Sequence, residues 1–208
     1  MILIDFEDGL GRITISRVEK ANSLTAGMLA ELEAAFLDLR GRPDLRAVIL
    51  TGAGKVFSAG ADLEAARAGL ATSPLWERLS GAVSGMPCLT VAALNGTVAG
   101  GAMGMVLACD LRIAVPEARF FYPVMRLGYL PQPSDPARLA ALAGPSRARV
   151  ILLAGQKIGA EEALAWGLVD RLATPEALIP EAIALCADAR AGKDGHAAAI
   201  KAMIPAGP

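Results

Sequence analysis

Apolar positions along this chain follow two patterns, which alternate through most of the sequence. Short apolar runs, some alternating with polar residues, predict β-strands at residues 2–6, 12–16, 46–51, 89–94, 110–115 and 118–121. Apolar residues at helical spacing predict helices at residues 25–39, 63–69, 74–84, 137–143, 146–154, 160–166 and 176–190. Strands that alternate with helices in this way are typical of α/β folds, in which crossover helices join parallel strands.

Local signals mark where several of these elements begin and end. Residues 7–11 (EDGLG) form a polar turn with two glycines, so we expect the first two strands to pair as a hairpin. Thr25 is a suitable N-cap for the first helix, and Gly41 and Pro43 end that helix. A proline-rich loop at residues 130–136 separates the strands from a helical C-terminal third.

Two loops rich in glycine and alanine lie between apolar runs and helical ones, at residues 57–63 (FSAGADL) and 95–102 (NGTVAGGA). The second loop leads into a helix that we expect to end near residue 108. Side chains this small allow a ligand to lie directly on the backbone, and N–H groups at a helix start are free to donate hydrogen bonds. Two such loops facing one another could hold an oxyanion between two N–H donors, which indicates chemistry at a carbonyl group. Close packing of a helix on a strand explains either loop alone equally well.

Composition and charge exclude several classes of protein. Of the 208 residues, 54% are hydrophobic and 20% charged, which predicts a folded chain with a substantial core. The net charge is −1 and the basic residues do not cluster, so nucleic acid is not an expected partner. Three scattered cysteines without metal-type spacing are typical of reduced core thiols in a cytoplasmic protein, and no metal site is expected. Asp5 comes too early in the chain for a signal peptide.

Membrane insertion and histidine-based catalysis are both disfavoured. Residues 88–109 carry no charge and could span a bilayer, but Asn95 and Gly96 form a strong turn signal inside this run. A buried strand, a turn and a buried helix explain the run better, so no membrane partner is expected.

The glycine patterns of dinucleotide-binding, phosphate-binding and serine hydrolase loops do not occur. His196 is the only histidine and lies near the C-terminus, which disfavours a catalytic Ser-His or Cys-His pair.

A set of motifs follows one order along the chain. These are KANSL at residues 20–24, FSAGADL at 57–63, NG through GG at 95–101, ACD at 108–110, LG at 127–128, a helix at 144–152 and AEEA through GLVD at 160–170. In this order they resemble the crotonase family of enoyl-CoA hydratases and isomerases, and the resemblance extends to about residue 172. It implies an α/β, crotonase-like spiral of ββα units with a short helical C-terminal part. We therefore expect a core domain at residues 1–172 and a C-terminal helical segment, a truncated trimerisation region, at residues 173–208.

The resemblance also implies a function and the residues that serve it. It implies that the chain binds an acyl-CoA thioester and stabilises its oxyanion or enolate with the backbone N–H groups of Ala61 and Gly101. Coenzyme A would enter as part of the substrate, with no permanently bound cofactor. The residues implied to hold it are Lys20, Ala21, Ser23, Ala59, Gly60, Asp62 and Leu63. Lys20 and Arg17 are candidates for contacts to the CoA phosphates, although solvated surface charges fit the sequence equally well.

The chain departs from the family pattern at both acid/base positions. Hydratases of this family use two glutamates to orient and deprotonate water, and the resemblance places Gly104 and Val124 at these positions. Neither residue can transfer a proton, so ordinary hydratase activity is not expected. Asp135 in the proline-rich loop is a candidate acid/base residue, but an aspartate before Pro136 is more typical of a helix N-cap. Tyr122 is another proton donor near the expected site, although an aromatic residue in an apolar run is more often part of the core.

Three functions therefore remain open from the sequence. The first is an acyl-CoA-acting lyase or isomerase of fatty acid metabolism, and the second is a non-catalytic, degenerate homologue that only binds acyl-CoA. The third is a scaffolding protein that retains only the fold. The resemblance implies a homotrimer or hexamer. Family members usually continue through further C-terminal helices, so we expect the short C-terminus to weaken this oligomer. We expect the protein to be cytoplasmic.

Overall fold

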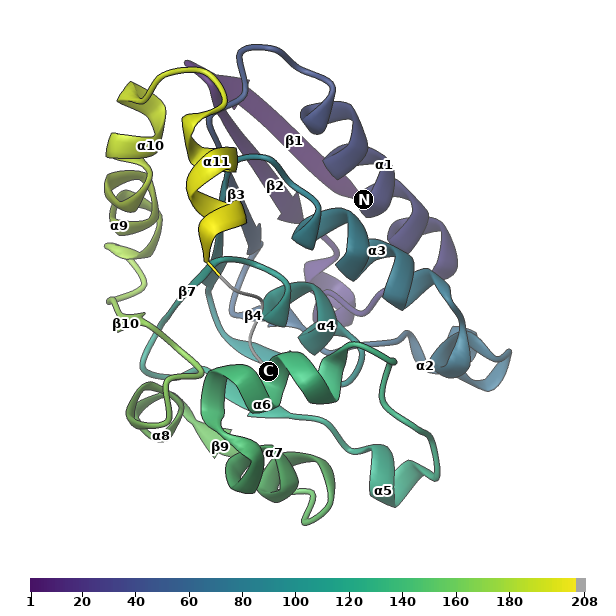
Figure 1. Cartoon of the computed structure of the whole chain (residues 1–208). Coiled ribbons are helices and arrows are strands. Elements are labelled where there is room, and N and C mark those ends of the chain that lie inside the picture. The colour runs from purple at the N-terminus through teal and green to yellow at the C-terminus, as the bar shows by residue number, and fades with distance from the viewer. Residues whose placement is uncertain (205–208) are drawn as a thin grey trace.

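The computed structural model describes residues 1–204, and its strands form two sheets (Figure 1). The strands are β1 (Ile2–Glu7), β2 (Leu10–Ile15), β3 (Ala47–Gly52), β4 (Val56–Ser58), β5 (Leu89–Leu94), β6 (Thr97–Ala99), β7 (Leu111–Ala114), β8 (Arg119–Phe121), β9 (Ile158–Gly159) and β10 (Arg171–Leu172). The larger sheet has the order β1-β2-β3-β5-β7-β10 and the smaller has the order β4-β6-β8-β9. β1 and β2 form the expected antiparallel hairpin, and β2, β3, β5 and β7 run parallel as predicted. The two-residue strand β10, which was not predicted, adds a further parallel strand beside β7.

The two sheets arise from a repeated unit along the chain. A long strand in the larger sheet is followed by a short strand in the smaller one, and this happens for β3 and β4, for β5 and β6, and for β7 and β8. Helices then return the chain to the larger sheet, as parallel strands require. The predicted α/β spiral of ββα units is therefore confirmed.

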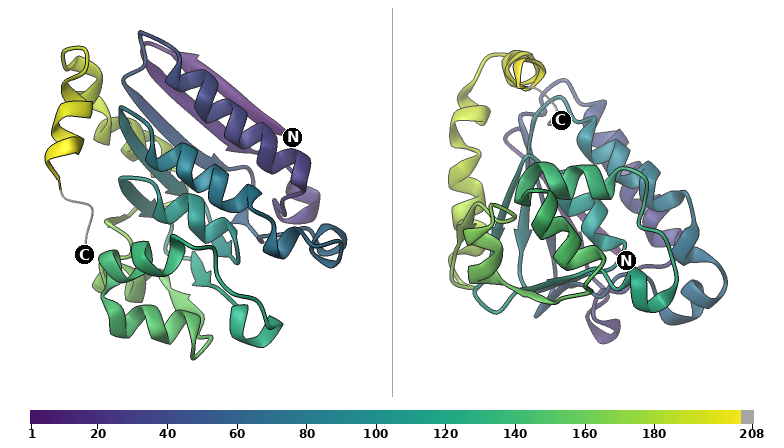
Figure 2. Two further views of the ribbon diagram at one scale, coloured as in Figure 1. Left: turned by 45° about the vertical axis from the view of Figure 1, so that its right-hand side comes forward. Right: turned by 60° about the horizontal axis from the view of Figure 1, so that its bottom comes forward.

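Helices cover both faces of the larger sheet (Figure 2). They are α1 (Ala26–Arg40), α2 (Leu63–Arg67), α3 (Leu75–Ser84), α4 (Ala102–Leu107), α5 (Val124–Leu127), α6 (Asp135–Ala143), α7 (Pro145–Leu152), α8 (Ala160–Ala165), α9 (Leu178–Leu185), α10 (Ala187–Ala191) and α11 (His196–Met203), with short 3₁₀ turns η1 (Val18–Lys20) and η2 (Leu70–Thr72). α1 packs on α3 and α3 packs on α4 along one face, while α9 contacts β5 and β7 from the other. Along β3, residues 47–51 are buried, as expected of a central parallel strand between two helical layers. Within the described residues, no helix is both long and apolar enough to cross a membrane.

The structure differs from the predicted elements mainly where segments are short. β4 overlaps the first segment predicted as a loop and β6 lies inside the second, because three-residue strands gain their order from pairing with each other and with β8. The helix predicted at residues 176–190 is interrupted at Cys186 and forms α9 and α10. The predicted cap on the first helix is confirmed, since Thr25 Oγ1 accepts a hydrogen bond of 3.3 Å from the N–H of Met28.

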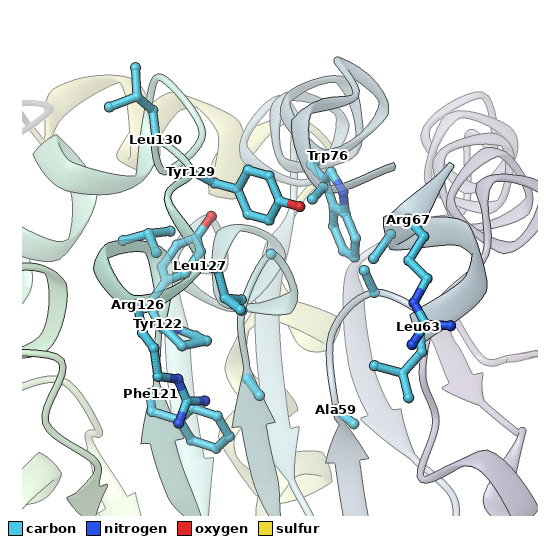
Figure 3. Close-up of a pocket in the computed structure, with 18 residues that line it drawn as sticks. Ala59, Leu63, Arg67, Trp76, Phe121, Tyr122, Arg126, Leu127, Tyr129 and Leu130 are labelled. Carbon is cyan, nitrogen blue, oxygen red and sulfur yellow. The ribbon is translucent and has the colours of Figure 1, made fainter. Parts of the chain in front are cut away.

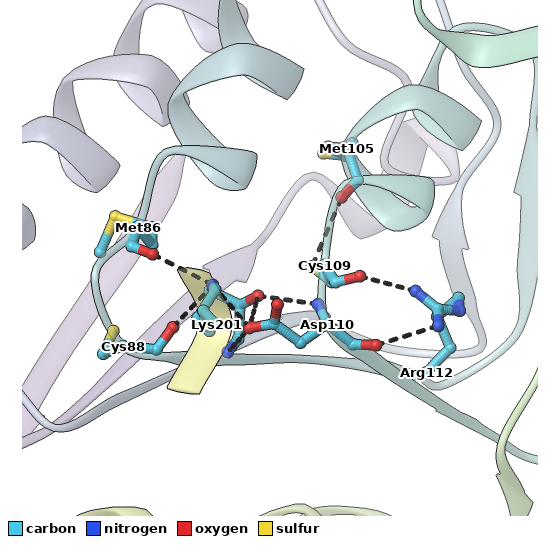
Figure 4. Close-up of polar contacts among 8 residues, drawn as sticks. Met86, Cys88, Met105, Cys109, Asp110, Arg112 and Lys201 are labelled. Carbon is cyan, nitrogen blue, oxygen red and sulfur yellow. Dashed lines mark hydrogen bonds and ion pairs between the residues drawn. The ribbon is translucent and has the colours of Figure 1, made fainter. Parts of the chain in front are cut away.

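Hydrogen bonds from two cationic side chains, Lys201 and Arg112, connect segments that lie far apart in the sequence (Figure 4). Lys201 in α11 donates hydrogen bonds to the carbonyl oxygens of Met86 and Cys88, both at 3.0 Å, and pairs with Asp110 Oδ2 at 2.8 Å. The guanidinium of Arg112 is buried and donates to the carbonyl oxygens of Cys109 at 2.7 Å and Leu168 at 3.0 Å. The buried charge of Arg112 is tolerated because its nitrogen atoms donate hydrogen bonds to acceptors in the fold.

Candidate functional site

The two small-residue loops meet at one edge of the smaller sheet. β4 and β6 are parallel neighbours, so the loops that follow them leave the sheet at the same edge. Gly60 has φ +87°, and a Cβ atom built on it would lie only 2.7 Å from the carbonyl oxygen of Ala99. Glycine is therefore needed here both for its backbone conformation and for the close approach of the second loop. The contact brings residues 59–61 beside residues 99–101.

One residue from each of these loops lines a common pocket. Ala61 and Gly101 both line it, and the N–H of neither residue donates a hydrogen bond within residues 1–204. Gly101 immediately precedes α4, so its N–H lies at a helix N-terminus. The indole of Trp76 packs against Gly101 so closely that a Cβ atom there would lie 2.8 Å from the ring. Trp76 is itself fixed by a 2.8 Å hydrogen bond from its Nε1 to the carbonyl oxygen of Leu70.

The pocket has a volume of about 440 Å³ and a largely apolar lining (Figure 3). Tyr129 and Leu127 stand on one side of the opening, and Trp76 and Arg67 on the other. Arg67 and Arg126 are the charged residues in the lining, and within the described residues no carboxylate lines the pocket. An apolar pocket with a few polar groups at one end is the usual form of a small-molecule site.

A second, more polar hollow adjoins the first. Its volume is about 700 Å³, and it shares Ala59, Ala61, Leu63 and Arg67 with the apolar pocket. Further predicted site residues line this hollow, namely Arg17, Lys20, Ser23 and Asp62. The predicted residues Ala21 and Gly60 lie in the same two segments but do not line either hollow.

Backbone pairing holds the two predicted coenzyme-binding segments together. Leu24 donates its N–H to the Gly60 carbonyl and accepts from the N–H of Asp62, both at 2.8 Å. The buried side chain of Asn22 donates to the carbonyl oxygens of Ala53 at 2.9 Å and Val56 at 2.7 Å. The segments at residues 20–24 and 59–63 are therefore neighbours, although about forty residues separate them in the sequence.

Arg17 and Asp62 form an ion pair inside the polar hollow. Arg17 Nη1 lies 2.9 Å from Asp62 Oδ2, and Asp62 Oδ1 accepts the N–H groups of Glu64 and Ala65 at the start of α2. The N–H of Ala65 and the guanidinium of Arg17 hold the pKa of Asp62 below its usual value. Arg17 is therefore already paired, whereas Lys20 is exposed and forms no ion pair within residues 1–204.

The two positions at which the resemblance implies glutamates, Gly104 and Val124, have different surroundings. Val124 lines the apolar pocket and supplies no polar group. Gly104 lies on α4, where a Cβ atom would lie 2.8 Å from Asp135 Oδ1. Asp135 is 1% exposed, and its Oδ2 accepts a 2.9 Å hydrogen bond from the hydroxyl of Tyr122, a residue that lines the pocket. Asp135 itself does not line the pocket, but it is hydrogen-bonded to Tyr122, which does.

Asp135 does not act as the helix cap that its position before a proline suggested. The N-cap of α6 is Ser134, and within residues 1–204 the carboxylate of Asp135 accepts no backbone N–H. The N–H and hydroxyl of Ser134 instead bind the carboxylate of Glu77. Burial raises the pKa of Asp135 to about 6, and burial together with the neighbouring Asp135 charge also raises the pKa of Tyr122.

Sequence reasoning missed several residues of the pocket. Trp76 and Arg67 line it from helices whose periodicity gave no sign of a pocket. Arg126 also lines it and lies in α5, a four-residue helix that was not predicted. The sequence signal for Trp76 was only an aromatic residue on an amphipathic helix, which core packing explains equally well. His196 lies on α11 and lines neither the apolar pocket nor the polar hollow.

The ββα spiral, with its two small-residue loops meeting over a pocket, defines a protein of the crotonase fold. A family model described as enoyl-CoA hydratase/isomerase matches residues 5–207. A Mycobacterium leprae protein named "Probable enoyl-CoA hydratase echA8" is 34% identical over 191 residues, 88% of this chain and 73% of its own length. A carnitinyl-CoA dehydratase from Citrobacter koseri is 37% identical over 177 residues, 82% of this chain and 67% of its own length.

A solved structure agrees with these sequence matches. The enoyl-CoA hydratase/isomerase of Pseudoalteromonas atlantica superposes with a TM-score of 0.90 at 28% identity, covering 97% of this chain and 81% of that one. The chain belongs to the enoyl-CoA hydratase/isomerase family.

Proposed function

We propose that this protein binds an acyl-CoA thioester and stabilises its oxyanion or enolate with the N–H groups of Ala61 and Gly101. The observation that carries the proposal is that Ala61 and Gly101 line one pocket and that neither N–H group donates a hydrogen bond within residues 1–204. Donors fixed in place before the reaction stabilise developing charge at little reorganisation cost. The names of the relatives, which refer to enoyl-CoA and carnitinyl-CoA, support a CoA thioester as the ligand.

The two adjoining hollows provide separate places for the two parts of such a ligand. The acyl group would occupy the apolar pocket, and the coenzyme would lie along the polar hollow beside residues 20–24 and 59–63. Lys20 and Arg67 are the basic residues there that form no ion pair within residues 1–204, so they would contact the phosphates. Arg17 would act indirectly, by fixing Asp62 at the start of α2.

Ordinary hydration is not the proposed reaction. Gly104 and Val124 supply no carboxylate to hold the attacking water, and no carboxylate within the described residues lines the pocket. Purified protein should therefore leave the enoyl absorbance of crotonyl-CoA unchanged. Clear loss of that absorbance would show that another residue activates water and would contradict this part of the proposal.

Binding of acetoacetyl-CoA tests the oxyanion site directly, because its enolate has a near-ultraviolet band of its own. The wild-type protein should bind this thioester and increase the enolate band. Ala61→Pro removes the N–H donor, and Ala61→Gly is the matched control that keeps it. Loss of one such donor costs about 2.7–4 kcal/mol, so A61P should weaken enolate binding by at least about a hundredfold, with A61G close to wild type. Equal binding by both variants, with both folded by circular dichroism, would refute the assignment of Ala61.

A second candidate function, binding without catalysis, is favoured by the loss of both glutamates. In that case the protein would bind acetoacetyl-CoA as its enolate but would not exchange the α-protons of a saturated acyl-CoA with solvent. A protein that only uses the fold as a scaffold would show no affinity for either thioester.

A further inference from the structure

A carboxylate occupies the space beside the bare backbone of Gly104. A Cβ atom on Gly104 would lie 2.8 Å from Asp135 Oδ1 and 3.2 Å from Oδ2, so any side chain at position 104 would displace this carboxylate. Position 104 is where the family resemblance places the first glutamate. The chain therefore has a carboxyl group next to that position, but it comes from α6 rather than from α4.

Tyr122 connects this carboxylate to the pocket. Its hydroxyl donates to Asp135 Oδ2 at 2.9 Å and accepts the N–H of Gln132 at 3.4 Å. Tyr122 directly follows β8 and lines the same pocket as Ala61 and Gly101, with 4% of its surface exposed. Tyr122 therefore borders the pocket and is hydrogen-bonded to Asp135, which is the arrangement that a proton relay through its phenol oxygen requires.

The surroundings of Asp135 are poor for stability and suited to proton transfer. Its Oδ1 is buried and has no hydrogen-bond partner within residues 1–204. The titratable or charged groups that face it are Tyr122, Glu77 on α3 and Arg138 on α6, and α4 offers none. Leaving a buried carboxylate oxygen unpaired is costly, and such groups are concentrated at functional sites. Burial raises the pKa of Asp135 to about 6, so both of its protonation states are accessible near neutral pH.

We propose that Tyr122 is the catalytic proton-transfer residue of this site and that Asp135 is the positioning residue that accepts its proton. The inference rests on the proposed binding of an acyl-CoA thioester. In the forward step the Cα–H bond of the acyl group breaks, and its electron pair forms the enolate held by Ala61 and Gly101. The proton moves to the phenol oxygen of Tyr122 while the phenol proton moves to Asp135 Oδ2. The reverse step protonates the enolate, so the step is balanced without another reactant.

Exchange of the α-protons of butyryl-CoA for deuterium, followed by mass spectrometry in heavy water, tests this pair. Tyr122→Phe keeps the ring but removes the hydroxyl, and Asp135→Asn keeps the shape but removes the base. Each should lower the exchange rate by about a hundredfold or more, the usual contribution of a positioned acid or base. Asp44→Asn makes the same change at an exposed carboxylate outside both hollows and should leave exchange unchanged.

The pH profile separates proton transfer from a merely structural role. Wild-type exchange should rise as pH increases through about 6, where Asp135 ionises, and D135N should lose this inflection.

If D135N does not fold, the exchange rate of Y122F alone tests the proposal, because this variant retains the aromatic ring. Enolate binding of acetoacetyl-CoA is measured on every variant. Absence of that binding in the wild type would refute the proposed function, and the proton-transfer pair with it. Normal enolate binding with no wild-type exchange, or with exchange unaffected in Y122F, would refute the pair alone.

Discussion

Replacing Asp135 by asparagine should change how the stability of the protein depends on pH. In the folded protein the carboxyl group is buried, one of its oxygens has no hydrogen-bond partner within residues 1–204, and its pKa is about 6. In the unfolded chain the pKa returns to the ordinary value of 3.8. The folded state therefore binds this proton more tightly than the unfolded state does.

The sign and the size of the effect follow from these two values. The stabilisation by the protonated carboxyl is complete below about pH 4 and is lost as pH rises through about 6. The difference between the two pKa values corresponds to about 3 kcal/mol of unfolding free energy. Asparagine does not titrate, so relative to wild type D135N should gain about this amount between about pH 4 and about pH 7. Any fixed cost of the asparagine amide is the same at every pH and cancels in this comparison.

Urea unfolding followed by circular dichroism, at several pH values for both proteins, measures the difference. Asp62→Asn is a control of opposite sign, because hydrogen bonds and Arg17 lower the pKa of Asp62 in the folded state. Relative to wild type, D62N should therefore lose stability as pH rises through the acid range. A difference between wild type and D135N that does not vary with pH would refute the reasoning about Asp135.

Other predictions concern packing, the C-terminal helix and thiol reactivity. Gly101→Ala should lower the unfolding free energy by about 1–3 kcal/mol, because the new methyl group meets the Trp76 indole. Gly81→Ala, where a Cβ meets nothing within 4 Å in a helix, should instead raise it by up to about 1 kcal/mol, and thermal melts would show opposite shifts. Lys201→Met should speed hydrogen exchange in α11, since three acceptors including Asp110 lose their donor; unchanged exchange would contradict the role of this contact. A thiol reagent near pH 8 should label the native protein slowly and the urea-unfolded protein at once, because burial raises the pKa values of all three thiols to about 11 or 12. The thiols are those of Cys88, Cys109 and Cys186.

The order of the elements was readable from the sequence because it depends on local patterns. The parallel strands, the first helix with its Thr25 cap and the hairpin at residues 7–11 all follow from apolar periodicity and turn residues. The two loops rich in glycine were also visible, because small side chains leave the backbone accessible wherever the loops lie. The resemblance to the crotonase family also placed Gly104 and Val124 where its hydratases carry glutamates, and that expectation needed only the order of the sequence motifs.

Only the tertiary structure decided what surrounds these residues. The sequence does not show that Trp76 packs on Gly101, or that Arg17 pairs with Asp62 across 45 positions. It placed Asp135 beside a proline and so favoured a helix cap, whereas the fold buries that carboxylate against Gly104 and behind Tyr122. Periodicity reports which face of an element is buried, but not which element from a distant part of the chain covers it. The contact between α6 and a bare glycine of α4, and therefore the protonation chemistry proposed here, is fixed by packing between two helices that are not neighbours in the sequence.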